Sequence, residues 1–103
     1  MKLKDSTVNP FGMTAELLFG LIIADQVWKE NGKELVVTSL NDGKHSVTSL
    51  HYSGNAADLR TRYFSDPELI AGLLREKLQN TDYDVVVESG HIHFEYQPKR
   101  KKS

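Results

Sequence analysis

The chain has 103 residues, enough for one domain with a single hydrophobic core. Apolar residues make up 39% and charged residues 26%, which excludes a disordered chain, and a net charge of -1 gives no bias toward nucleic acid or an anionic membrane. There is no cysteine, which excludes disulfides and thiolate zinc sites, so any metal must be bound by imidazole and carboxylate groups.

The first third of the chain predicts an irregular lead-in followed by a helix. Residues 1–13 are polar and contain the turn-forming sequence Asn9-Pro10-Phe11-Gly12. Thr14 is a suitable N-cap, and Asn31-Gly32 is a typical helix stop. Between them apolar residues recur at helical spacing and are expected in the core: Leu17, Leu21, Ala24 and Trp28, with Leu18 and Ile22 widening the stripe.

The apolar run within this helix, residues 17–24, is too short to span a bilayer. It also lies behind Glu16 and too far inside the chain for a secretory signal. We therefore expect a soluble cytoplasmic chain without membrane insertion, which reaches any substrate outside the cell by another route.

The rest of the chain predicts two strands, a helix and two further strands. The strands are expected at residues 35–38, 56–60, 83–87 and 91–97, and the last two are joined by a tight turn at Ser89-Gly90. Ser65-Asp66-Pro67-Glu68 has the spacing of a capping box, and its helix should end near Asn80. The order αββαββ predicts a single α+β domain, two helices packed on a mainly antiparallel sheet, with a basic tail at 98–103.

The last strand alternates clearly between two faces. Ile92, Phe94 and Tyr96 would lie on the face that packs on the helices, while His91, His93, Glu95 and Gln97 would lie on the other. Two imidazoles beside a carboxylate suggest the floor of a site, with Glu95 able to orient a neighbouring imidazole. An exposed polar strand face is the alternative.

The four histidines fall in two segments, which suggests a metal site. A hydrolytic zinc site needs three nitrogen or oxygen ligands, an open position for water and a nearby acid–base group. His51 and Asp58 flank Gly54, whose freedom permits a turn that brings both side chains to one metal. Residues 88–93 would supply the remaining ligand and the acid–base group. Histidines also cluster by chance in loops.

A family resemblance supports the metal interpretation. The pattern Ser49-x-His51-x-x-Gly54-x-Ala56-x-Asp58, followed by His91-x-His93, resembles the signature of the D-alanyl-D-alanine carboxypeptidase and dipeptidase family of zinc peptidases, which includes phage endolysins. The chain is also similar to the signalling domain of hedgehog proteins, which has the same fold and keeps a zinc. Together these motifs cover residues 42–58 and 83–97, about a third of the chain.

The resemblance implies a hedgehog/DD-peptidase-like fold and a role for each matched residue. His51, Asp58 and His93 would be the zinc ligands, with His93 chosen because the family ligand is the second histidine of the pair. Many dipeptidase members have a catalytic glutamate where this chain has Gly90, so either Glu88 or His91 would be the catalytic base. Further candidates, which would contact the substrate, are Lys44, His45 and Ser49, with Arg60 and Arg62 as possible carboxylate-binding groups.

These observations predict a monomeric zinc metallopeptidase that hydrolyses peptidoglycan stem peptides, as a D,D-carboxypeptidase or an L-Ala-D-Glu endopeptidase. The alternative is a non-catalytic, zinc-stabilised interaction module of the hedgehog kind. Binding of nucleic acid through the basic tail is disfavoured because the body of the chain is not basic.

Overall fold

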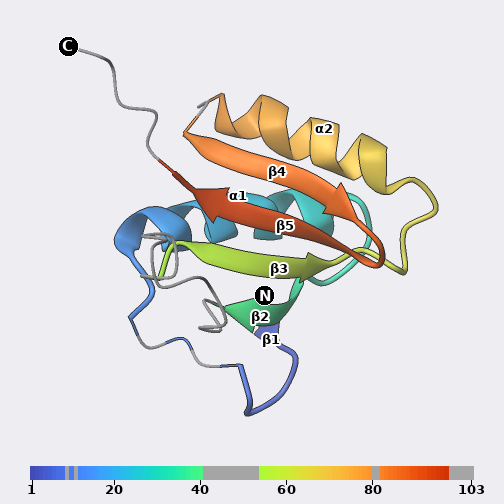
Figure 1. The fold of residues 1–103 in the computed structure, drawn as a ribbon. Helices are drawn as coiled ribbons and strands as arrows, with labels where there is room; N and C mark the ends of the chain where they lie inside the picture. Colours follow the sequence, from blue (N-terminus) through green and yellow to red (C-terminus); the bar gives the residue numbers. More distant parts are fainter. Residues whose placement is uncertain (9, 11, 41–53, 80–81, 98–103) are drawn as a thin grey trace.

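The computed structural model describes residues 1–8, 10, 12–40, 54–79 and 82–97. These residues form two helices, α1 (Ala15–Glu30) and α2 (Pro67–Leu78), and one sheet of five strands, β1 (Lys2–Leu3), β2 (Val36–Leu40), β3 (Ala56–Arg60), β4 (Tyr83–Glu88) and β5 (His91–Tyr96). The strand order is β1-β2-β3-β5-β4, and only the short β1–β2 pair is parallel (Figure 1). The predicted α+β class is therefore confirmed.

The caps of α1 form as the sequence predicts. The Thr14 hydroxyl accepts a hydrogen bond from the Leu17 N–H at 3.1 Å, and the chain leaves the helix at Asn31, before Gly32 with φ of 82°. The width of the buried stripe was predicted wrongly, because Leu18 and Ile22 are 42% and 54% exposed.

The start of α2 corrects the expected capping box. Asp66, not Ser65, is the N-cap, and its carboxylate accepts a hydrogen bond from the Leu69 N–H at 3.2 Å. Pro67 follows as the first helical residue, where its fixed φ favours the helix and its missing N–H costs nothing. The helix ends at Leu78, two residues earlier than expected.

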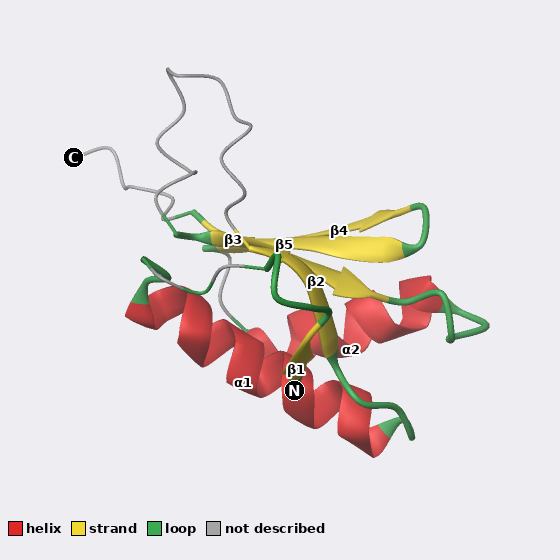
Figure 2. Ribbon diagram, turned by 90° about the horizontal axis from the view of Figure 1, so that it is seen from below, coloured by secondary structure: helices red, strands yellow, loops and turns green. Residues whose placement is uncertain are grey.

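Both helices cover the same face of the sheet, and the core lies between the two layers (Figure 2). Phe94 of β5 and Tyr83 of β4 stack with ring centroids 5.4 Å apart, directly beneath Gly20 of α1. Trp28 is fully buried, and its indole N–H donates to the Arg60 carbonyl at 3.1 Å. No helix of the described residues covers the opposite face of the sheet.

Two smaller points complete the comparison with the sequence prediction. The segment expected to be irregular contains β1, where Lys2 and Leu3 pair with Val36 and Val37. A strand of two residues is too short to show alternation, so no sequence pattern predicts it. Neither helix in the described part of the chain is long and apolar enough to cross a membrane.

Candidate functional site

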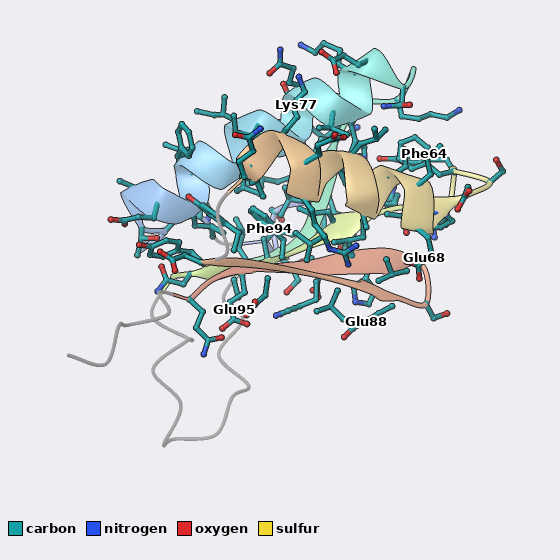
Figure 3. All side chains as sticks on the ribbon, turned by 90° about the horizontal axis from the view of Figure 1, so that it is seen from above. Phe64, Glu68, Lys77, Glu88, Phe94 and Glu95 are labelled. Carbon is teal, nitrogen blue, oxygen red and sulfur yellow. The ribbon has the colours of Figure 1, made fainter. Side chains whose placement is uncertain are left out.

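The face of the sheet that no described helix covers, called the uncovered face below, gathers the predicted acidic and imidazole groups on three adjacent strands. Asp58 of β3 lies directly opposite His93 of β5, and His91 of β5 lies opposite Glu88 of β4. Residues paired across antiparallel strands project from the same face. Figure 3 shows Glu88 and Glu95 on the side of the sheet away from the helices, with Phe94 on the helix side.

His93 is held between two carboxylates. Its Nδ1 lies 3.0 Å from Asp58 Oδ1, and its Nε2 lies 3.0 Å from Glu95 Oε1. Asp58 reaches the ring from the neighbouring strand, whereas Glu95 lies two residues further along β5 on the same face. The ring is therefore fixed at both nitrogens by groups on paired strands.

This environment raises the pKa of His93 from the ordinary 6.5 to about 9. The hydrogen bond to Asp58 is the largest cause, partial burial opposes it, and the bond to Glu95 adds to it. An ionised carboxylate accepts hydrogen bonds and cannot donate them. Both ring nitrogens of His93 must therefore donate to satisfy these two contacts. In the metal-free protein His93 is accordingly an imidazolium at neutral pH.

His91 and Glu88 form a second pair beside the first. His91 Nε2 lies 2.9 Å from Glu88 Oε1, and His91 Nδ1 lies 3.2 Å from the Ser89 carbonyl oxygen. The same Nε2 is 3.8 Å from Asp58 Oδ1. Both ring nitrogens of His91 therefore face acceptor oxygens.

Together these five side chains form a continuous series of contacts on β5 and its two neighbouring strands, which we call the carboxylate–imidazole row: Glu88, His91, Asp58, His93 and Glu95. From the sequence, Glu88 was expected to reach the His93 face only if the Ser89-Gly90 turn moved it inward. In the structure no such movement is needed, because Glu88 pairs with His91 as the last residue of β4.

Two of the three zinc ligands implied by the resemblance are adjacent in this row. Two ligand atoms about 2.05 Å from a tetrahedral zinc stand about 3.3 Å apart. The 3.0 Å between His93 Nδ1 and Asp58 Oδ1 is within a few tenths of an ångström of that separation, so the pair fits a shared metal. The third implied ligand, His51, lies outside the described residues. Within those residues no group of three or more metal-binding side chains has the geometry to hold an ion.

The predicted substrate contacts are less completely placed. Lys44, His45 and Ser49 lie outside the described residues. Arg60 is on the same face as the row, opposite His91, whereas Arg62 is exposed beyond the end of β3.

Gly54 adopts the turn conformation that the sequence predicts, whereas the expected approach of His51 to Asp58 lies outside the described residues. Gly54 has φ of 90°, and a Cβ there would overlap the Gly12 carbonyl oxygen, so this position accepts only glycine. Its carbonyl accepts a hydrogen bond from the Thr14 N–H at 3.0 Å, which ties the start of β3 to the N-terminus of α1. Asp58 therefore enters the sheet from a fixed point.

The family resemblance implied that Asp58 and His93 lie close together, as ligands of one metal. The sequence did not indicate how they meet, because β3 and β5 are neighbours in the sheet but not in the chain. Comparison with models of known protein families gave no match for this chain, and comparison with curated proteins gave no match either.

Proposed function

We propose that this chain is a zinc metallopeptidase that hydrolyses peptidoglycan stem peptides, with the hedgehog/DD-peptidase-like fold. The observation that carries the proposal is the carboxylate–imidazole row. It places two implied ligands, Asp58 and His93, 3.0 Å apart and sets the acid–base candidates Glu88 and His91 beside them. His51 would complete the ligand set.

The charge of the row supports a cation site. The row contains three carboxylates and two imidazoles. With its carboxylates ionised it carries a net negative charge even when both imidazoles are protonated, and a divalent cation would compensate that charge. Zinc, when bound, supplies a Lewis acid that polarises an amide carbonyl and lowers the pKa of the attacking water. The imidazole and carboxylate donors suit zinc chemistry in a chain without cysteine.

Glu88 and His91 act in this proposal as one proton-accepting pair. His91 Nε2 faces both Glu88 and Asp58, so it is the nearer of the two groups to the ligand pair, and Glu88 holds the ring from the exposed side. The pair takes the proton of the attacking water and returns a proton to the leaving amine. Lys44, His45 and Ser49 remain the proposed contacts to the substrate.

The proposal is tested by incubating zinc-loaded protein with purified muropeptides and following products by mass spectrometry. We expect cleavage of one bond, either D-Ala-D-Ala or L-Ala-D-Glu, and loss of cleavage on addition of a chelator. Glu88→Gln and His91→Ala should each lower turnover on the order of a hundredfold while zinc content stays near wild type. Stoichiometric zinc without any product would support the non-catalytic interaction module instead.

A further inference from the structure

We propose that Glu95 is a positioning residue, which holds the Nε2 side of His93 and thereby assigns Nδ1, the nitrogen beside Asp58, as the metal-binding atom. This inference rests on the proposed zinc site. It goes further by naming the ring nitrogen that binds and the group that selects it.

The burial of Glu95 is the first observation. Its side chain is 12% exposed, whereas the side chain of His93, its neighbour on the same uncovered face, is 32% exposed. A carboxylate taken out of water needs strong hydrogen-bond donors to offset the lost hydration. The Nε2 of His93, at 3.0 Å, is such a donor.

The hydrogen-bonding capacity of imidazole then decides the tautomer. A neutral ring carries one proton, and only the other nitrogen has a lone pair for a metal. Each nitrogen faces a carboxylate oxygen at 3.0 Å, Nε2 that of Glu95 and Nδ1 that of Asp58. A cation bound by Asp58 would replace the proton on Nδ1, so the ring would keep its remaining proton on Nε2, beside Glu95. Nδ1, 3.0 Å from Asp58 Oδ1, is left to bind the cation beside that carboxylate.

The backbone makes this arrangement independent of the metal. His93 and Glu95 lie two residues apart on β5, which is hydrogen-bonded on both sides, to β3 and to β4. The spacing between the ring and the carboxylate is therefore set by strand geometry. Groups that fix the second nitrogen of a metal-bound imidazole typically contribute about 10- to 100-fold to metal affinity.

The test uses the full chain and zinc alone, with Glu95→Ala, Glu95→Gln and, as a control, Glu76→Gln. The control removes the same unit of charge from the exposed surface of α2, on the other side of the sheet. Zinc affinity is measured by competition with a chelator. The ring protonation of zinc-loaded, ¹⁵N-labelled protein is read from long-range ¹H–¹⁵N spectra.

We expect the wild-type protein to carry the His93 proton on Nε2. Glu95→Ala should weaken zinc binding about 10- to 100-fold, Glu95→Gln should weaken it less because its amide oxygen still accepts, and Glu76→Gln should leave it unchanged. A wild-type spectrum with the proton on Nδ1 overturns the inference, and so does a Glu95→Ala affinity within about twofold of wild type.

If Glu95→Ala does not fold, Glu95→Gln and the wild-type spectrum still decide the matter. Wild-type protein that binds no zinc would refute the proposed function itself, whereas unaltered binding by the Glu95 variants refutes only this inference.

Discussion

The stability of the metal-free protein should fall as the pH rises from 6.5 to 9, because of His93. Its pKa is raised to about 9 in the folded state, against the 6.5 of an unperturbed imidazole. A group whose folded pKa is raised binds its proton more tightly when folded, so it stabilises the fold fully below pH 6.5. That contribution is lost as the pH passes the folded pKa.

The size of the effect follows from the environment of the ring. Each tenfold change in proton affinity corresponds to about 1.36 kcal/mol. A folded-state pKa of about 9 against 6.5 therefore limits the contribution of His93 to the free energy of unfolding to at most about 3.4 kcal/mol. The His93 side chain is 32% exposed, and water screens its contacts with Asp58 and Glu95. We therefore expect a loss of about 1–2 kcal/mol, which for a domain of this size lowers the melting temperature by roughly 4–8 °C per kcal/mol.

The measurement compares urea unfolding of wild type and His93→Gln at pH 6.0 and pH 9.5, with a chelator present. Other groups also titrate over this interval, so the informative quantity is the difference between the two proteins. Wild type should lose about 1–2 kcal/mol more than the variant. Equal losses in both proteins would show that Asp58 and Glu95 do not hold an imidazolium, and the argument from the row would fail.

Three further substitutions test the packing that supports the site. Gly20→Ala should destabilise by about 1–3 kcal/mol, because a Cβ there would stand 2.5 Å from the Phe94 ring and 2.8 Å from the Tyr83 ring. Gly72→Ala, in a helix with nothing within 4 Å of the added carbon, should instead stabilise by roughly 0.5–1 kcal/mol, and equal melting-temperature shifts in the two variants would contradict this account. Thr61→Val should be neutral or stabilising in urea unfolding, because the Thr61 hydroxyl is fully buried and has no hydrogen-bond partner among the described residues, so a clear loss would reveal a hidden partner.

The sequence predicted those parts of the fold that depend on local chemistry. The cap at Thr14 and the stop at Asn31-Gly32 are read from a few adjacent residues, and both form as expected. The buried width of α1 is different, since it depends on what packs against the helix. Leu18 and Ile22 lie on the apolar stripe, yet the sheet and α2 cover only part of that stripe and leave both side chains exposed.

The site likewise combines one contact that adjacent residues determine with another that depends on strands far apart in the chain. A two-residue turn pairs the residues that flank it, so the turn at Ser89-Gly90 implies that Glu88 lies opposite His91. The sequence prediction, which required the turn to move Glu88 inward, overlooked this pairing. The approach of Asp58 to His93 was implied only by the family resemblance and had no such local signal. It depends on β3 and β5 being neighbours, although α2 and β4 separate them in the chain.

The exposure of the carboxylate–imidazole row changes from one end to the other, and this gradient matches a division of labour. Glu95 is the most buried side chain of the row, and Glu88, at 49%, is the most exposed. A buried carboxylate is held in one position by its donor, which suits a group that orients His93. An exposed carboxylate exchanges protons with water quickly and can rotate toward a substrate, which suits a group that moves protons with His91. Under the proposed function, the two metal-binding candidates, Asp58 and His93, would lie between the proton-accepting pair and the group that orients His93.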